Sequence, residues 1–458
     1  MIKFNRFFSA LAFSFCAFMP FACTTMRYKE VQLTSASYGH LLNSTQCFSP
    51  DDEWLVYDTR NDETKIISTL NIEAVNTKTK AVKLVYKTPN GTVYGPGVGA
   101  ATFAPIGNKV LFIHGIRNAD KEHPYDFTRR TGVAIDLSKT DKLVFMDARN
   151  ISQPFTPGAL RGGTHAHTWS GDGKWISFTY NDYILQQLAK VDSNYHDRRV
   201  VGVMSSVKKV VVNNPEGSLE DNNGEYFAAV VTQLTDKPKW GSDEIDKAFD
   251  ECWIGNDGYI KENGLQQKHA IAFQGNVYNE QGKVKTELFV VDLPADITQA
   301  RTGFPIEGTA TSLPNVPAGV SQRRITFTNA GVKGPRHWLR ANPNGSSIAF
   351  LAEDVNGLVQ IYGISPNGGK ITQITFNKFS VSGPFNFSPD GQKIAYIADG
   401  SVFVTDLQTH KSIRETVKFN GSKGLIGAPI WSNNGKMLAY NKYVTNNDGQ
   451  FLQLFLLH

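Results

Sequence analysis

Short segments in which apolar and polar residues alternate recur along the whole chain, each directly after a turn rich in Gly, Pro, Asn and Asp. Glycine and asparagine tolerate the positive φ of tight turns, and β-branched and aromatic residues favour strands. Each segment therefore predicts a β-hairpin. The hairpins are CFSPDDEWLVY (47–57), TFAPIGNKVLF (102–112), TWSGDGKWISF (168–178), ANPNGSSIAF (341–350), NFSPDGQKIAYI (386–397) and IWSNNGKMLAY (430–440).

Further strands follow most of these hairpins. VQIYGI (359–364) and TELFVVDL (286–293) have the pattern of a third strand, and KITQITF (370–376) has that of a fourth. Four short strands, repeated at intervals of roughly 40 to 60 residues, are typical of the blades of a β-propeller. The sequence therefore predicts an all-β protein built as a propeller.

The two ends of the chain predict how the ring closes. YKEVQLT (28–34) has the pattern of an outermost strand but precedes the first hairpin, whereas GQFLQLFLLH (449–458) supplies a third strand and then the chain stops. The N-terminal strand is therefore expected to complete the last blade. This arrangement covers a strand edge that would otherwise pair with other chains.

Residues 213–328 form the irregular part of the repeat. Within them GSDEIDKAFDECW (241–253) predicts a helix, because Ile245, Phe249 and Cys252 share one helical face. One blade with this helical insertion gives seven blades in total, and two blades would give eight. We predict seven.

The N-terminus has the pattern of a secretory signal. Lys3 and Arg6 precede an apolar run that ends at Ala22, which is short for a membrane span. Residues 1–22 are thus a predicted signal peptide and 27–458 the exported propeller. Cys23 at the cleavage point leaves two alternatives: a plain periplasmic protein, or an outer-membrane lipoprotein attached to the membrane only by this anchor.

Composition narrows the possible partners. The chain has 458 residues, 41% of them hydrophobic and 19% charged, which is enough to build a sizeable core. A net charge of +5 without a Lys/Arg run argues against a nucleic-acid partner. Only Cys47 and Cys252 lie in the body of the chain. We expect buried free thiols there rather than a disulfide.

Three histidines have a strand position that points to chemistry. In a propeller, the innermost strand of each blade precedes the hairpin turn and lines the central channel. His165 and His337 both lie four residues before the residue that precedes the turn, and His167 lies two before it. Strand alternation would place His165 and His167 on one face, with Cα atoms about 6.5 to 7 Å apart. These three side chains are a predicted site for a divalent metal such as manganese or zinc, although a channel histidine can also simply bind water or a carbonyl group.

Arg161 precedes the same strand. Its position predicts a place at the channel mouth, where a guanidinium could bind a carboxylate in a bidentate manner. A surface or loop role is the alternative. Tyr125, Asp126, Arg129 and Arg130 form a further polar cluster, functional or merely packed in a loop.

The repeats resemble the TolB-like, or WD40-like, propellers of bacterial periplasmic proteins. A closer resemblance, to the uncharacterised bacterial YidR family, is carried by strings that run in order from residue 39 to 340. They include GHLLN, FIHG, LRGGTHAH, SFTYND, GSDEI and PRHWLR. The YidR resemblance implies a TolB-like propeller and no established activity. The H-x-H pair is also similar to that of oligogalacturonate lyases, propellers that hold a divalent metal, usually manganese.

Two functions remain open at this point. The first is an exported propeller that binds a glycan or protein ligand at a histidine-lined channel mouth. The second, implied by the lyase resemblance, is a metal-dependent uronate lyase that acts by β-elimination. In the lyase the metal would be held by His165, His167 and His337, and the catalytic residues would be His165, His337 and Arg161.

Overall fold

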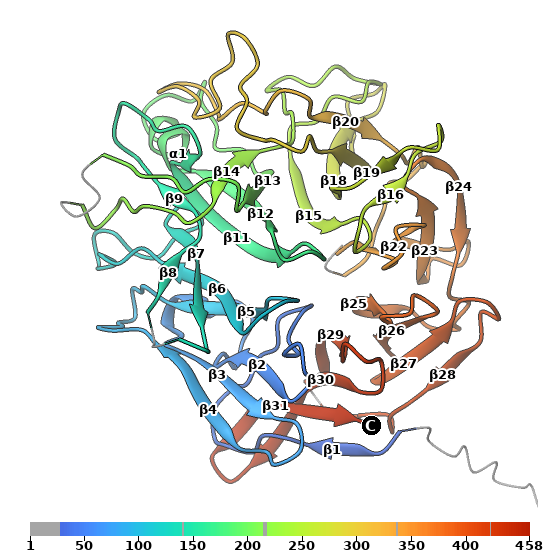
Figure 1. Ribbon diagram of the computed structural model, residues 1–458. Coiled ribbons are helices and arrows are strands. Elements are labelled where there is room, and N and C mark those ends of the chain that lie inside the picture. Colours follow the sequence, from blue (N-terminus) through green and yellow to red (C-terminus); the bar gives the residue numbers. More distant parts are fainter. Residues whose placement is uncertain (1–27, 140–141, 214–217, 336–337, 422) are drawn as a thin grey trace, which may run out of the picture.

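Seven β-sheets surround a central axis in the computed structural model, which describes residues 28–458 except 140–141, 214–217, 336–337 and 422 (Figure 1). The predicted all-β propeller with seven blades is confirmed. The predicted signal peptide, residues 1–22, and Cys23 lie outside the described residues. No helix in the described part of the chain is long and apolar enough to cross a membrane.

The blades follow one another along the chain. Blade 1 has β2 (Trp54–Asp58), β3 (Asn71–Asn76) and β4 (Val82–Lys87); blade 2 has β5 (Val98–Phe103), β6 (Lys109–Gly115), β7 (Arg130–Asp136) and β8 (Val144–Phe145); blade 3 has β11 (Gly162–Trp169), β12 (Trp175–Asp182), β13 (Val200–Ser205) and β14 (Phe227–Val230). Blade 4 has β15 (Ala248–Trp253), β18 (Ala270–Tyr278), β19 (Val284–Asp292) and β20 (Ser321–Arg324); blade 5 has β21 (Arg340–Ala341), β22 (Ile348–Glu353), β23 (Val359–Ser365) and β24 (Gly368–Gln373). Blade 6 has β25 (Val381–Phe387), β26 (Lys393–Ala398), β27 (Ser401–Asp406) and β28 (Ser412–Arg414); blade 7 has β29 (Leu425–Trp431), β30 (Leu438–Asn446), β31 (Gly449–Leu457) and β1 (Glu30–Gln32). Outside the blades lie the short pairs β9 (Ala148–Arg149) with β10 (Ala159–Leu160) and β16 (Tyr259–Ile260) with β17 (Gln266–Gln267), a 3-10 turn (Ile66–Ser68) and the helix α1 (Tyr183–Ala189).

The N-terminal strand closes the ring as predicted. β1 pairs antiparallel with β31, with Glu30 opposite Leu457 and Gln32 opposite Phe455. The last blade is thus built from both ends of the chain (Figure 1). The outer edge of β31 is covered, so its backbone groups are not free to pair with another molecule.

A repeated serine explains why the hairpin turns recur so clearly in the sequence. The hydroxyl of Ser170 donates to the Asp172 carboxylate (2.6 Å) and accepts a hydrogen bond from the backbone N–H of Trp175 (3.0 Å). The same serine-to-backbone bond recurs from Lys393 to Ser388 and from Met437 to Ser432. Each turn is therefore stabilised locally, by its own residues.

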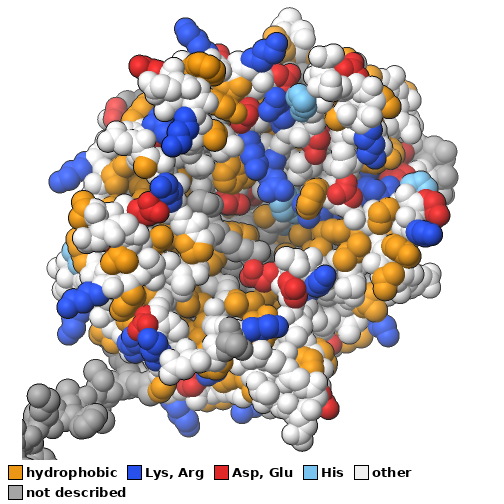
Figure 2. Space-filling view, turned by 180° about the vertical axis from the view of Figure 1, so that it is seen from behind, with side chains coloured by type: hydrophobic (Ala, Val, Ile, Leu, Met, Phe, Trp, Pro, Cys, Tyr) orange, Lys and Arg blue, Asp and Glu red, His pale blue; other side chains and the backbone are white. Residues whose placement is uncertain are grey.

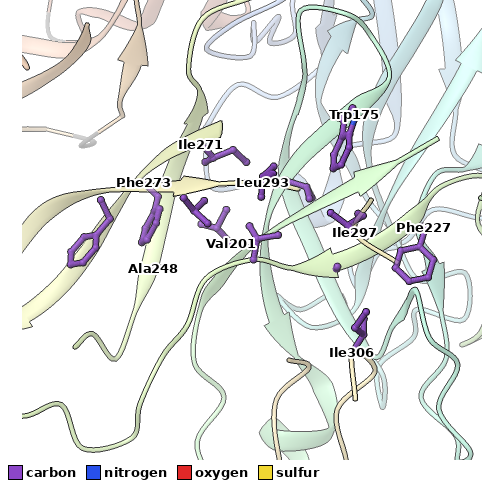
Figure 3. Close-up of a cluster of buried hydrophobic side chains, with 14 of the residues drawn as sticks. Trp175, Val201, Phe227, Ala248, Ile271, Phe273, Leu293, Ile297 and Ile306 are labelled. Carbon is purple, nitrogen blue, oxygen red and sulfur yellow. The ribbon is translucent and has the colours of Figure 1, made fainter. Parts of the chain in front are cut away.

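Apolar side chains pack between neighbouring blades. Figure 3 shows one such cluster, in which Trp175, Val201 and Phe227 of blade 3 face Ile271 and Phe273 of blade 4. Each of these side chains is less than a tenth exposed. Full burial of one such side chain contributes about 1.5–3 kcal/mol, so the blade interfaces supply much of the stability.

The helix predicted over 241–253 is wrong. Residues 248–253 form β15, the innermost strand of blade 4. A bulge at Asp250, with φ of 52°, changes the register between Phe249 and Cys252 and so spaces the apolar residues as a helix would. The helix that does form is α1, which begins after Asp182; the Asp182 side chain accepts from the backbone N–H of Leu185.

Similar bulges interrupt the innermost strands of other blades. Ala100, Ala166 and Gly427 have φ of 55°, 59° and 73°, and the strand register shifts at each of them. The bulge is thus a property of the repeat. It also means that residues two apart on these strands do not simply share a face.

Candidate functional site

A cavity of about 390 Å³ lies at the end of the central axis where the hairpin turns of all seven blades meet. Its lining includes an aromatic side chain from every blade: Phe48, Phe103, Trp169, Trp253, Trp338, Phe387 and Trp431. Glu251 and Arg340 are charged residues in the same lining. Figure 2 shows one face of the molecule with a hollow at its centre, and Lys, Arg, Asp, Glu and His side chains lie around it.

The bulge at Ala166 separates the two histidines of the H-x-H pair. The backbone of His165 pairs with Thr179 of β12, and its side chain is half-buried. His167 is 1% exposed, and its Nε2 lies 2.9 Å from the Thr164 hydroxyl. It packs toward blade 2, where a Cβ built on Gly132 would come within 2.8 Å of that nitrogen. His167 therefore fills the interface between blades 2 and 3.

His165 lies among positive charges. Burial, followed by the charges of Arg130 and Arg199, holds the pKa of His165 well below its usual value, so this imidazole is neutral at physiological pH. Its Nδ1 has no hydrogen-bond partner. A neutral imidazole beside two guanidinium groups favours an anion and disfavours a cation.

Arg130 and Arg199 make few direct contacts, although the charges of Asp197, Asp250 and Glu251 also act on Arg199. Arg130 donates from Nη1 to the Tyr125 hydroxyl (3.1 Å), and its Nε has no partner. Among the arginines that the structure describes, Arg199 and Arg301 are the two whose side chains make no hydrogen bond or ion pair. Burial and the charge of Arg130 lower the pKa of Arg199. Arg199 therefore has N–H groups available for a ligand.

Glu251 of blade 4 contacts Thr179, the residue of β12 that pairs with His165. The Thr179 hydroxyl donates to Glu251 Oε2 (2.9 Å), whereas Glu251 Oε1 has no partner. Glu251 is 6% exposed, and burial raises its pKa to about 7. Arg130, His165, Arg199 and Glu251 together are called the channel site below. It combines two positive charges with a neutral imidazole and a carboxyl group, Glu251, whose pKa lies near neutral pH.

Arg161 is not a ligand-binding residue of the channel. It is 1% exposed, and its Nε donates to the Asp182 carboxylate (2.8 Å). Its two terminal nitrogens donate to the backbone carbonyls of Thr309 and Ser312. Arg161 therefore holds the segment around residue 310 against blade 3, and the predicted carboxylate-binding role is wrong.

Loop packing accounts for most of the polar cluster near residue 125. Arg129 pairs with Glu220, and Asp126 accepts from the Thr128 hydroxyl and the Gln186 amide. These contacts tie loop segments to one another and to α1. Of the four clustered residues, Tyr125 and Arg130 are the pair that reaches the channel site, through their mutual hydrogen bond.

The described part of the predicted metal site does not suit a divalent cation. His337 lies outside the described residues. Elsewhere in the described chain, no three His, Cys, Asp or Glu side chains are grouped to hold a metal. The Nδ1 atoms of His165 and His167 are free, but burial and then the charge of Arg130 lower the pKa of both rings, and that charge would repel a cation there. Cys47 and Cys252 are buried free thiols, as predicted.

Sequence patterns did not reveal Arg199 and Glu251. Glu251 falls inside the wrongly predicted helix, and Arg199 stands beside Arg198 at the start of an ordinary strand. A signal was present for Glu251: DECW occupies the same position relative to a Gly–Asn–Asp–Gly turn as the other innermost strands occupy relative to theirs. For Arg199 no local pattern exists, because its partners come from other strands.

Comparison with known proteins confirms the resemblance to YidR. Residues 97–217, which include Arg130, His165 and Arg199, match the family described as a protein of unknown function (DUF3748). The uncharacterized protein YidR of Escherichia coli (strain K12) is 36% identical over 285 residues. The matched region spans 62% of this chain and 62% of the relative's length.

Solved structures confirm the fold. An oligogalacturonate lyase in complex with manganese superimposes with a TM-score of 0.55, at 12% identity, over 95% of this chain and 94% of its own. An oligogalacturonate lyase from Vibrio parahaemolyticus matches 95% of this chain and 94% of its own, with 9% identity and a TM-score of 0.52. At these identities, the lyase comparison shows a shared propeller and no shared activity.

Proposed function

We propose that this protein binds an acidic glycan, through a carboxylate of the sugar, at the channel site. The observation that carries the proposal is Arg199: a partly buried guanidinium without a hydrogen bond or ion pair, next to Arg130 and a neutral His165. A carboxylate would accept charge-assisted hydrogen bonds from both arginines. The free Nδ1 of His165 would take part in a hydrogen bond to a sugar hydroxyl.

The neighbouring cavity suits the rest of a sugar ligand. Trp253 and Trp338 are half-buried in its lining, and Glu251 offers an acceptor oxygen without a partner. Aromatic faces cover the apolar faces of sugar rings, while acceptors bind their hydroxyl groups. The predicted signal at residues 1–22 supports a location outside the cytoplasm, in the periplasm or, through an acylated Cys23, at the outer membrane.

Calorimetric titration with a uronic-acid disaccharide and with its neutral hexose counterpart tests this proposal. We expect the acidic sugar to bind at least tenfold more tightly, because only its carboxylate engages Arg130 and Arg199. Equal affinity for the two sugars, or no heat with either, would contradict the proposal. Recovery of a protein partner that binds at the channel site in place of a glycan would also contradict the proposal.

The second candidate is β-elimination of a uronate, favoured by the paired proton acceptors of the channel site. A carboxylate held by the arginines acidifies the neighbouring C5–H. Glu251 or the neutral His165 would accept that proton, the C–H electrons would form the C4=C5 double bond, and the C4–O bond would break. The departing oxygen would take a proton. The manganese of the lyase structure has no counterpart among the described donors of this chain, so the arginines would bind the carboxylate in its place.

The unsaturated product absorbs ultraviolet light, so a uronic-acid oligosaccharide assay separates the two candidates. Product from the wild type, absent with Glu251→Gln, supports the lyase. Tight binding without product supports the binding protein. The assay is run with a chelator and again with added manganese, because a strict requirement for manganese would contradict the arginine-based mechanism.

A further inference from the structure

A second cavity, of about 580 Å³, lies beside blade 3 and away from the channel site. Three segments of the chain line it, residues 194–200, 230–236 and 301–316. Apolar side chains such as Val230 and Leu313 alternate there with amide and hydroxyl groups. Cavities of this size hold small organic molecules in other proteins.

Arg301 is the unsatisfied group of this cavity. Its guanidinium lies over the Phe304 ring, 4.9 Å from the ring centroid, and its buried Nε has no hydrogen-bond partner. No described carboxylate pairs with it. Arg198, in the same lining, is already paired with Asp236 (2.8 Å). A buried donor left unpaired is unfavourable, so a ligand that supplies an acceptor to it gains affinity.

The Arg301 cavity and the channel site lie on opposite sides of one piece of backbone. Arg198 and Val200 line the Arg301 cavity, whereas the charge of Arg199, between them, acts on His165 in the channel. Alternate residues of an extended segment point in opposite directions, which explains this division. A ligand in the Arg301 cavity is therefore separate from a ligand in the channel.

We propose that the Arg301 cavity is a binding site for a small organic carboxylate with an apolar ring. Arg301 binds the carboxylate, and its stacking on Phe304 orients the planar guanidinium for a two-point contact. The ring contacts the apolar wall at Val230 and Leu313. This site goes beyond the proposed glycan-binding function and does not depend on it.

Saturation-transfer NMR on the full chain tests the site with three probes: benzoate, uncharged benzyl alcohol and ring-free acetate. We expect a benzoate signal at least fivefold stronger than either of the others. Arg301→Met should lower the benzoate signal at least fivefold, and Arg301→Lys should retain part of it. Arg414→Met should leave it unchanged, since Arg414 pairs with Asp399 in blade 6 and lines neither site.

Two controls keep the result interpretable. The melting temperature of Arg301→Met should match the wild type, and Lys283→Met, at an exposed hairpin position, should bind benzoate normally. Displacement of benzoate by inorganic phosphate at equal concentration would overturn the preference for a carboxylate. Equal signals from benzoate and benzyl alcohol, or a benzoate signal unchanged in folded Arg301→Met, would overturn the site itself.

Discussion

At the scale of single residues, a substitution of Arg199 can distinguish an effect on ligand binding from an effect on folding stability. It makes no hydrogen bond or ion pair in the folded protein, so its removal breaks no contact of that kind. Its positive charge raises the local potential at His165 and is itself disfavoured by burial.

We therefore expect Arg199→Met to weaken binding of a uronic-acid disaccharide at least tenfold while leaving the free energy of unfolding unchanged or slightly higher. Calorimetry gives the affinity, and urea denaturation gives the stability. Arg414→Met is a matched control, since Arg414 pairs with Asp399 at a distance from the channel. A loss of affinity equal in the two variants would count against a specific role for Arg199.

Glu251 makes the protein sensitive to pH. Its pKa is about 7 in the folded protein and near 4.3 in an unfolded chain, so the folded state binds more protons between these values. Because the carboxyl group ionises at a lower pH in the unfolded chain than in the folded protein, rising pH lowers the free energy of the unfolded state first. Stability is therefore highest below about pH 4.3 as far as this group is concerned and falls as pH rises toward 7.

Glu251→Gln should remove this contribution and stabilise the protein at pH 8 relative to the wild type, by an amount on the order of a few kcal/mol. Unfolding in urea at pH 5, 6, 7 and 8 measures it. Burial also raises the pKa of Asp147, to about 6, and this acts in the same direction. Part of the decrease in stability with rising pH therefore remains in the Glu251→Gln variant. Identical pH profiles for the two proteins would show that Glu251 does not titrate in this range.

At the scale of elements, strand β11 shows how one bulge sets the site. Ala166 has a left-handed φ of 59° between His165 and His167, and the register of β11 with β12 shifts there. Non-glycine residues adopt this conformation at a cost of about 1–2 kcal/mol, and β-branched residues at more.

Ala166→Gly should therefore leave the unfolding free energy equal or higher, and Ala166→Val should lower it by about 1–3 kcal/mol. Thermal and urea unfolding of both variants give the comparison. The valine variant should also lose affinity for the acidic sugar, because His165 would be displaced from Arg130 and Arg199. A stable Ala166→Val protein with normal binding would argue against the bulge as the feature that positions His165.

The Arg161–Asp182 pair connects three elements: the start of β11, the end of β12 and the segment around residue 310. Removing one partner of a buried ion pair leaves the other charge unpaired, at a cost of about 3–5 kcal/mol. Arg161→Met should cost that much stability in urea denaturation. The folded fraction of this variant should bind the acidic sugar with near-normal affinity. If Arg161 were catalytic, the substitution would instead lower the activity and leave the stability unchanged.

At the scale of the whole molecule, the ring depends on β1. Three residue pairs join β1 to residues 455–457 of β31 (Gly449–Leu457), and the backbone N–H of Leu33 adds a bond to the Leu454 carbonyl. A chain beginning at residue 36 should therefore expose this edge, lower the melting temperature and associate at micromolar concentration. Light scattering measures the association. A chain beginning at residue 28 is the control and should remain monodisperse.

The sequence by itself determined the repeating architecture and the closure of the ring, whereas it left seven or eight blades open, a choice that the structure decided. Hairpins are specified by local interactions, such as those of Ser170 with Asp172 and with the Trp175 backbone, so each repeat carries its own signal. The burial of Cys47 and Cys252 as free thiols also followed from composition.

The tertiary structure alone decided which side chains share the channel. Alternation predicts His165 and His167 on one face, but a backbone bulge at Ala166 and the packing of His167 against blade 2 separate their surroundings. The same kind of bulge made β15 look helical. Arg130, Arg199 and Glu251 come from three different blades or connections, and no local pattern reports contacts made by residues so far apart in the chain. The charge and burial on which the proposed anion site depends exist only once the blades are assembled.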